Sequence, residues 1–468
     1  MTTALVWLRR DLRLDDHAAL SIALQNHARV IPVFVFDRTI LDPLPRDDRR
    51  IPFILDCLRQ LKTELQATGS DVVVRHGDPR EIIPQLACEL GAAAVHANRD
   101  YAPSALARDT AVSAALRLAG IDWFDHKDQV IFERDEVLTQ AGTPFGVFTP
   151  YWRRWQSRFA PADAAEYPTE PFRHRLARLA PQPLPSAAEI GFDDHPSPVP
   201  AGMHGAAARF DDFARRIDRY HETRDLPALE GTSGLGPHLR FGTISVRKLV
   251  RLALDHDSEG ARCWLKELGW REFYQQLLWH RPTLVAHAFR PEFDTLPFPN
   301  RQDWFAAWGE GQTGFPLVDA GMRELYQTGQ MHNRLRMVAA SFLIKDLLVD
   351  WRWGERHFAR LLLDFELASN SGGWQWAASV GCDAQPWFRI FNPVSQSQRF
   401  DPDGDYIRRF CPELAGLSAQ AIHAPWLASP QELGKAGIVL GRDYPLPFID
   451  HAIQRKAALA LFRQASGK

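Results

Sequence analysis

Ten of the fifteen tryptophans of this chain lie between Trp264 and Trp387. Four arginines stand among them: Arg271, Arg334, Arg336 and Arg389. Tryptophan is large, flat and easily oxidised, so this mixture indicates a pocket for something planar, anionic and redox-active. A flavin, unstacked nucleobases, or both would fit. A single Trp is more often a core residue, so the inference depends on the whole cluster.

The segment CWLKELGWREFYQQL predicts a helix that carries a sheltered carboxylate. Helical spacing places Trp264, Glu267, Trp270 and Tyr274 along one side, with Arg271 beside them. The alternative is an exposed i, i+4 pair of Glu267 and Arg271, which would contribute only ~0.3 to 0.5 kcal/mol. The flanking tryptophans favour a sheltered Glu267, and a sheltered carboxylate needs a partner or a chemical role.

The segment MHNRLRMVAASFLIKDLL predicts a second helix with one partly polar face, which holds Asn333, Arg336 and Met337. An arginine that enters an apolar run needs a matching acid, and Asp364 is a candidate. The alternative is an exposed Arg336 whose aliphatic stem alone is buried.

Two further segments could approach a ligand. In EGTSGLG, Thr232 and Ser233 stand between glycines and could offer hydroxyl and N–H donors to phosphate, although such turns are common. In ASNSGGWQWAAS, Trp374 and Trp376 are two residues apart, about 200° around a helix, so they face opposite surroundings.

The first ~130 residues alternate short β-branched runs with amphipathic helices, which predicts a doubly wound α/β domain with a parallel sheet. The expected strands are 5–8, 30–36, 72–75, 93–97 and 121–124, and the expected helices are 52–67, 79–90 and 103–119. Neither GxGxxG nor GxxxxGK[ST] follows any of these strands, which argues against a dinucleotide or triphosphate held in the usual way.

Nine prolines between Pro161 and Pro200 indicate a long connector without regular structure. Helical spacing of apolar residues then predicts helices over 245–254, 262–278, 333–350 and 356–363. We therefore predict an α/β domain over 1–130, a connector over 131–201 and an all-helical domain over 202–468.

The composition limits the possible binding partners of the protein and its cellular compartment. The net charge is only −2, so any polyanion must be met by a local basic patch. Five scattered cysteines without a CxxC spacing argue against disulfides and a metal site, and they suit a cytoplasmic protein. We expect no secretory signal and no membrane segment, because no apolar run reaches 18 residues.

Taken in order, these segments resemble the photolyase and cryptochrome family over nearly the full length. The resemblance rests on VWLRRDLRLDDHAAL, EGTSGLGPHLRFG, WLKELGWREFY, MHNRLRMVAASFLIKDLLVDW, NSGGWQWAAS and PWFRIFNP. It is greatest for bacterial photolyases that repair cyclobutane pyrimidine dimers. It implies a U-shaped FAD in the helical domain, a flipped-out dimer in damaged DNA as substrate, and a monomer. Photolyases are among the enzymes that flip bases.

The resemblance also implies roles for individual residues. Those that would line FAD are Tyr220, Thr232, Ser233, Gly234, Leu235, Gly236, Trp264, Arg271, Arg336, Asp364, Phe365, Glu366 and Asn370. Those that would contact the dimer or the DNA backbone are Arg224, Glu267, Trp270, Asn333, Arg334, Met337, Trp376, Arg389 and Gln396. Glu267 would stabilise charge on the dimer and Asn370 would lie near the flavin N5. Trp374 would pass an electron to the flavin, and Trp351 would then refill Trp374.

Some positions depart from the family pattern. Glu366 replaces a common Asp, Phe365 replaces a Gly, and Phe298 replaces the outermost Trp of the electron chain. Ser104 and Ala105 stand where folate-binding members carry Asn and Glu, so a second, antenna chromophore stays open between folate, deazaflavin and none.

Two other functions compete with repair. A cryptochrome-type blue-light receptor is the first, and Asn370 together with the short carboxyl end argues against it. An adenylate-binding α/β enzyme with a helical appendage is the second, and it would leave the tryptophan cluster unexplained.

Overall fold

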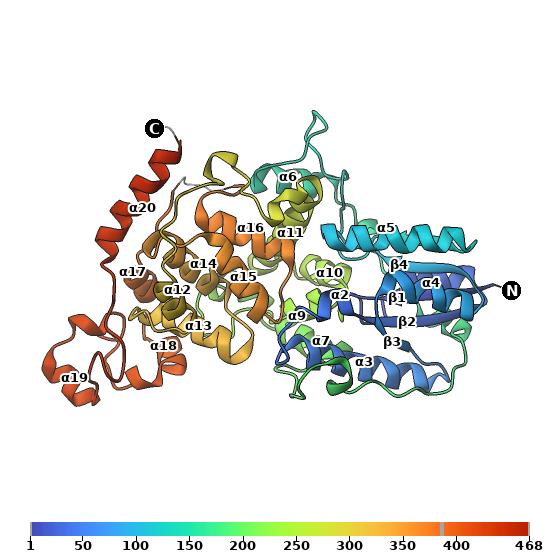
Figure 1. Cartoon of the computed structure of the whole chain (residues 1–468), viewed down its shortest axis with the longest axis horizontal. Coiled ribbons are helices and arrows are strands. Elements are labelled where there is room, and N and C mark those ends of the chain that lie inside the picture. The colour runs from blue at the N-terminus through green and yellow to red at the C-terminus, as the bar shows by residue number, and fades with distance from the viewer. Residues whose placement is uncertain (1, 384–387, 467–468) are drawn as a thin grey trace. The chain divides into compact units, whose positions relative to one another are not determined.

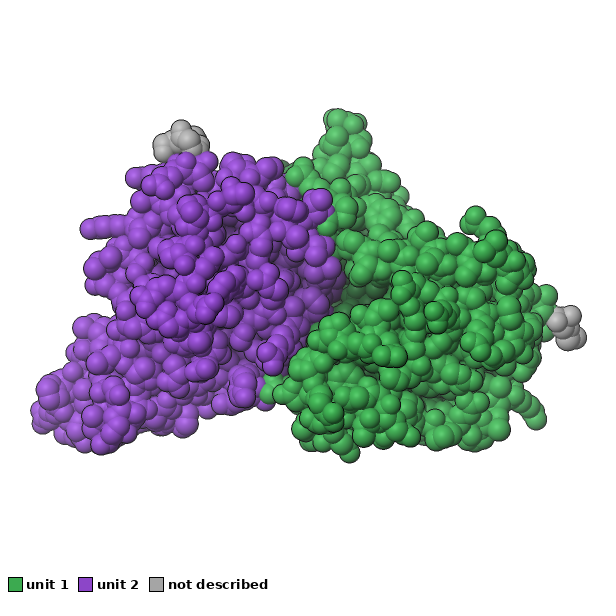
Figure 2. Space-filling model, in the orientation of Figure 1, with its two compact units in different colours: residues 1–218, 233–282 green, residues 219–232, 283–468 purple. Residues whose placement is uncertain are grey.

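The computed structural model describes residues 2–383 and 388–466, so Trp387 lies outside the described residues. Contacts divide the chain into two compact units, which Figure 2 colours separately. Unit 1 comprises Met1–Asp218 and Ser233–Pro282, and unit 2 comprises Arg219–Thr232 and Thr283–Lys468. The predicted domain boundaries at 130 and 201 stay a prediction.

Unit 1 contains the predicted parallel sheet, with five strands in the order β3-β2-β1-β4-β5. The strands are β1 (Thr3–Leu8), β2 (Arg29–Asp37), β3 (Val73–Gly77), β4 (Ala92–Asn98) and β5 (Asp122–His126). The accompanying helices are α1 (Ala18–Asn26), α2 (Arg38–Leu41), α3 (Arg50–Ala67), α4 (Pro79–Glu89) and α5 (Pro103–Leu118). Figure 1 shows α3 and α5 on opposite sides of the sheet. The doubly wound α/β fold is thus confirmed, although α1 was not predicted.

The proline-rich connector is irregular, as expected, but it is tied to the sheet. It contains short 3₁₀ turns at Pro161–Ala164, Glu170–Arg175 and Ala188–Ile190. The backbone N–H of Ala177 donates to Val30 O at 2.8 Å. The sequence analysis missed the helix that precedes this stretch, α6 (Phe148–Arg158). Unit 1 is completed by α7 (Gly202–Ala214), α9 (Gly236–Arg240), α10 (Val246–His256) and α11 (Glu259–His280).

Unit 2 is helical and is built around a large aromatic core that includes Trp308, Trp351 and Trp374. Its helices are α8 (Tyr220–Thr223), α12 (Gln302–Gly309), α13 (Pro316–Thr328), α14 (Asn333–Ser341), α15 (Trp351–Leu361), α16 (Leu367–Ala378), α17 (Pro393–Phe400), α18 (Asp405–Phe410), α19 (Pro430–Ala436) and α20 (His451–Ser466).

The helix predicted over 333–350 ends earlier than expected. After α14 the chain forms a π-helical turn at Phe342–Asp346, and Leu348 then adopts a φ of +51°, which a helix cannot continue through. In the π turn, the buried Asp346 accepts a hydrogen bond from His451 of α20 at 2.5 Å. This contact helps to hold the last helix on the core.

Across residues 2–383 and 388–466, no helix has the length and apolar character needed to cross a membrane. The same part of the chain contains no group of three or more His, Cys, Asp or Glu side chains arranged to hold a metal ion.

Candidate functional site

Helix α11 carries the predicted sheltered carboxylate on unit 1. Trp264 is 4% exposed and its ring packs against Phe213 at 4.8 Å. Glu267 and Arg271 are both half-buried, and Arg271 Nη1 donates to Gln129 O at 2.6 Å. Glu267 and Arg271 are therefore too buried to be the solvent-exposed pair of the alternative.

Trp270 occupies the next turn of α11 and is half-buried. Its ring stacks on Phe148 of α6, with centroids 3.7 Å apart and planes 11° apart. Gly269 permits this packing, because a Cβ there would lie 2.6 Å from the Trp152 ring. The half-buried Trp270 is thus a flat surface supported on one side by the Phe148 ring.

Glu272 ties α6 to α11, and the sequence analysis missed it. Its carboxylate is buried and accepts hydrogen bonds from Ile131 N, Phe132 N, Tyr151 Oη and Trp155 Nε1, at 2.7, 3.1, 3.2 and 2.7 Å. Burial raises the pKa of Glu272 to about 7, against these four donors, which lower it. The signal was present: Glu272 falls four residues after Leu268, on the apolar face of the helix.

Glu272→Gln is expected to destabilise the protein by about 1 to 3 kcal/mol at pH 5, because an amide N–H₂ cannot accept the hydrogen bond that Ile131 N donates to Oε2, whereas the oxygen of a protonated carboxyl still can. The folded pKa is raised, so the stability that the protonated carboxyl contributes is present below pH ~4.5 and is lost as pH rises through ~7. The deficit of the variant should therefore shrink by up to about 3 kcal/mol by pH 8. Urea unfolding at both pH values measures this, with exposed Glu310→Gln as control; a deficit independent of pH would contradict it.

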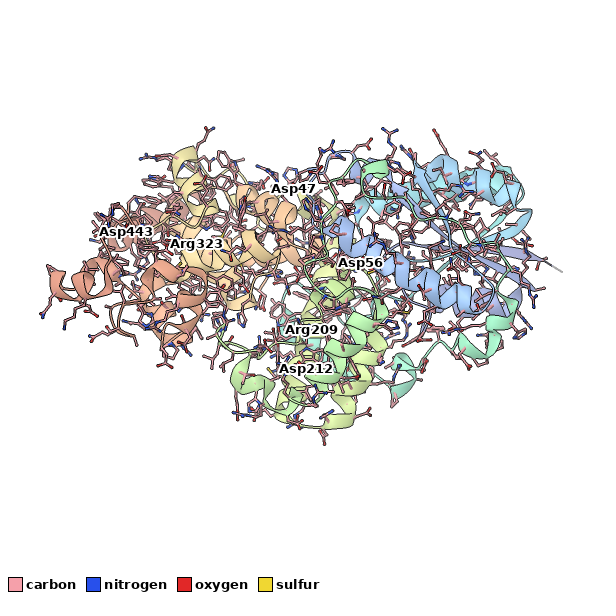
Figure 3. All side chains as sticks on the ribbon, turned by 90° about the horizontal axis from the view of Figure 1, so that it is seen from below. Asp47, Asp56, Arg209, Asp212, Arg323 and Asp443 are labelled. Atoms are coloured by element: carbon pink, nitrogen blue, oxygen red, sulfur yellow. The ribbon has the colours of Figure 1, made fainter. Side chains whose placement is uncertain are left out.

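The glycine-flanked loop passes from unit 2 to unit 1 between Thr232 and Ser233. Gly234 has a φ of +65°, and a Cβ there would lie 3.6 Å from the side chain of Arg209, which Figure 3 labels on α7. Ser233 Oγ accepts from Leu235 N at 3.3 Å, so its hydroxyl hydrogen stays available to a ligand. α9 begins directly afterwards, at Gly236.

Unit 2 supplies Tyr220 and Arg224 just before this loop. Tyr220 is 8% exposed, and the Arg224 guanidinium lies over its ring at 5.4 Å. Thr232, the last residue of the unit 2 segment, is half-buried.

The predicted pairing of Arg336 with Asp364 is confirmed. Arg336 Nη2 lies 3.0 and 2.9 Å from the two carboxylate oxygens, and Nε donates to Met331 O at 2.9 Å. Both side chains are partly exposed, at 30% and 19%. The pair therefore keeps an open edge for a ligand, and Arg336 is not the snorkelling arginine of the alternative.

The neighbouring polar residues of α14 differ in exposure. Asn333 is exposed and Met337 is half-buried, with Asn333 Nδ2 3.8 Å from Met337 Sδ. Arg334 pairs with Asp225 at 2.7 Å and lies over the Phe400 ring at 4.1 Å.

Two residues that depart from the family pattern, Phe365 and Glu366, follow Asp364 directly. Phe365 packs against the core of unit 2. Glu366 is the N-cap of α16 and accepts from Ser369 N at 3.0 Å, so this side chain has a structural task.

Asn370, one turn into α16, has its amide group oriented by a neighbour. Its Nδ2 donates to Glu355 O at 3.0 Å and to Glu355 Oε1 at 2.8 Å. Burial raises the pKa of Glu355. Among the described residues Oδ1 of Asn370 has no partner, so it is an acceptor free for a ligand N–H. A reduced flavin offers such a donor at N5, so this side chain fits that cofactor.

Trp374 and Trp351 are 2% and 1% exposed, and neither indole N–H has a hydrogen-bond partner in the part of the chain that the structure describes. A Cβ at Gly354 would lie 2.1 Å from Trp374, so only glycine fits there. Trp374 also contacts Trp308, with ring centroids 6.1 Å apart. Trp376, by contrast, is half-buried, as expected from its different helix face.

The outermost position of the predicted electron chain is occupied by Phe298 rather than by a tryptophan. Phe298 packs against Phe462 with centroids 6.1 Å apart. Of the nearby tryptophans, Trp353 contacts Phe305 at 5.3 Å, and Trp304 lies beneath the Arg301 guanidinium at 4.4 Å.

The remaining predicted residues lie at the surface or just below it. Arg389 is exposed, with its guanidinium 5.9 Å from the Phe391 ring. Gln396 has a buried Oε1 without a partner among the described residues. At the start of α5, Ser104 is exposed and Ala105 is buried, so neither offers the acid that folate-binding members carry.

Comparison with known proteins identifies the family of the chain. Residues 4–171 match the family described as DNA photolyase, and residues 264–464 match the FAD binding domain of DNA photolyase. The chain belongs to the DNA photolyase family. Curated relatives named deoxyribodipyrimidine photo-lyase are 41% identical in Synechococcus sp. (98% of this chain, 96% of the relative) and 38% identical in Escherichia coli (99% of both).

Solved structures of this photolyase family agree in fold. A bacterial class III photolyase from Agrobacterium tumefaciens has a TM-score of 0.91 at 37% identity and covers 100% of this chain and 98% of its own. A Synechocystis cryptochrome reaches 0.88 at 28% identity over 98% and 99%. An archaeal photolyase from Sulfolobus tokodaii with two FAD molecules reaches 0.80 at 28% over 99% and 100%.

Proposed function

We propose that this photolyase-family chain repairs cyclobutane pyrimidine dimers in DNA with light energy and FAD. The observation that carries the proposal is the pairing, on α11, of half-buried Glu267 with half-buried Trp270, whose ring is fixed against Phe148. A flipped-out dimer needs a flat apolar surface and a group that stabilises its carbonyl oxygens, and these two side chains provide both.

The proposal that the chain binds FAD rests on hydrogen-bond donors and acceptors that these side chains leave available. Arg336 and Asp364 form a partly open ion pair, Asn370 presents Oδ1, and Ser233 keeps a free hydroxyl hydrogen. Bound and reduced, FAD supplies an electron to the dimer under light and takes it back, so the repair has no net redox change. The protein residues hold the two partners in place, exclude water and stabilise charge where it develops.

The remaining residues expected from the resemblance complete the proposal. Trp264 and Tyr220 line the cofactor, and Arg224, Arg334 and Gln396 approach the DNA backbone. Asn333, Met337 and Trp376 surround the dimer.

We further propose a cytoplasmic monomer. Cys57, Cys88, Cys263, Cys382 and Cys411 are free thiols, which suits a reducing compartment. Size-exclusion chromatography with light scattering tests the oligomeric state.

The function is tested by mixing the purified protein with an oligonucleotide that contains one thymine dimer. We expect repair under blue light, none in the dark, and release of about one FAD per chain on heating, because the cofactor is held without a covalent bond. A cryptochrome, the second candidate favoured by the Synechocystis neighbour, would carry FAD without repairing the dimer. The protein spectrum also reports any antenna chromophore.

Arg389→Ala is expected to lower the salt dependence of binding to dimer-containing DNA. Each phosphate contact contributes about 0.9 to the slope of log K against log salt concentration, so the slope should fall by about one. Anisotropy titrations between 50 and 200 mM salt measure it. Exposed Arg455→Ala is the matched control, and equal slopes for the two variants would place Arg389 away from the DNA.

A further inference from the structure

A basic hollow lies beside α6 in unit 1, apart from the residues assigned above. Its lining is formed by loop residues 138–141, by Phe145, and by Arg153, Arg154 and Ser157 of α6, and its volume is about 540 Å³. Figure 1 shows α6 next to α11, with the loop that precedes α6 projecting beyond the helix. The three α6 residues are exposed.

The loop wall of this hollow is held in one shape. Thr139 N donates to Thr143 O at 2.9 Å, and the two threonine hydroxyls lie 2.8 Å apart. Gly142 turns the chain with a φ of +74° and donates to Thr139 O at 3.0 Å. A preformed wall loses little conformational entropy when a ligand binds.

The hollow is positively charged because of how α6 is built. The helix FTPYWRRWQSR contains three arginines and no acid, and its aromatic residues are buried, so Arg153 and Arg154 are directed outward. In the described part of the chain, neither guanidinium makes an ion pair or a hydrogen bond. Two adjacent unpaired guanidinium groups suit phosphate oxygens, which they can bind with paired N–H donors.

The position of α6 relates the hollow to the proposed substrate site. Phe148, the first residue of α6, stacks on Trp270 at 3.7 Å. Arg153 and Arg154 follow five and six residues later, about 7.5 to 9 Å along the helix. That length matches about two to three nucleotides of a DNA strand at ~3.4 Å each.

We propose that this hollow binds the backbone phosphates of the damaged DNA strand, two to three nucleotides from the dimer. The inference rests on the proposed function, because the place of Trp270 beside the dimer comes from it. Glu272 then acts as a positioning residue, since its bonds to Tyr151 and Trp155 fix α6 on α11.

The test uses the full-length protein and a duplex with one thymine dimer. The double variant Arg153→Ala, Arg154→Ala is compared with Arg117→Ala, Arg178→Ala. This control removes two exposed arginines of the same unit that likewise make no ion pair or hydrogen bond with any described residue. We expect the salt slope to fall by about two in the first variant and to stay unchanged in the second. Between 50 and 200 mM salt, the wild type should then lose about tenfold more affinity than the first variant.

Further readouts separate the explanations. Repair yield at saturating DNA and thermal stability should be unchanged, and Arg153→Lys, Arg154→Lys should restore most of the slope. An unchanged slope in the alanine variant overturns the inference while wild-type repair still supports the proposed function. Loss of a chromophore absorption band with unchanged DNA affinity also overturns it, because the hollow would then hold an antenna. A wild type that fails to bind dimer-containing DNA overturns both proposals.

Discussion

Trp374→Phe is expected to abolish light-driven reduction of the oxidised cofactor and to leave repair by the chemically reduced protein intact. Trp374 is 2% exposed and packs directly on Gly354, so a phenylalanine fits the site without exposing the core. Phenylalanine is far harder to oxidise than tryptophan, so it cannot pass an electron inward. Transient absorption of the oxidised protein, with and without a thiol reductant, measures the effect.

The residue that refills Trp374 can be found with two more variants. By family resemblance Trp351 does so, and Trp351→Phe should show the same loss. Trp308 is the second neighbour to test, because its ring contacts that of Trp374 at 6.1 Å. Half-buried Trp426→Phe is the matched control. If Trp351→Phe photoreduces at the wild-type rate and Trp308→Phe does not, electrons enter through Trp308, and the assignment of Trp351 is wrong.

Glu267→Ala is expected to lower the quantum yield of dimer repair by about tenfold or more while FAD content stays the same. A hydrogen bond to a charged group contributes about 1.5 to 3 kcal/mol, which corresponds to roughly 10- to 100-fold in the rate of a step that develops that charge. The carboxyl group matters chiefly while the dimer carries an extra electron, so ground-state affinity for the dimer should fall much less.

The two quantities are separated by measuring repair yield at saturating DNA and the dissociation constant in the dark. Glu267→Gln keeps the side-chain length and supplies an amide N–H donor, so it should recover part of the yield. Equal losses of affinity and yield in Glu267→Ala would assign Glu267 to binding alone.

Much of the fold follows from local patterns in the sequence. Short β-branched runs that alternate with amphipathic helices predict the five strands of the sheet. A strand covered on both faces is a continuous apolar run, as in β1 and β2, whereas a helix shows its buried face at a period of 3.6 residues. The pairing of Arg336 with Asp364 also follows, because an arginine within an apolar helix needs an acid close by. The sequence analysis missed α6 even though its buried aromatic residues, Phe148, Tyr151, Trp152 and Trp155, recur at the helical spacing i, i+3, i+4 and i+7.

Other features were decided by contacts between residues far apart in the chain. Glu272 receives hydrogen bonds from Ile131 and Phe132, about 140 residues earlier, and no local spacing shows which donors will surround a buried carboxylate. The capping role of Glu366 and the contact of Trp374 with Trp308 likewise depend on where the chain turns and packs. The sequence by itself determined the type of each element and the chemistry available to it. Tertiary structure decided which of those groups meet, because hydrogen-bond partners and ring contacts are set by distances in space rather than by separation along the chain.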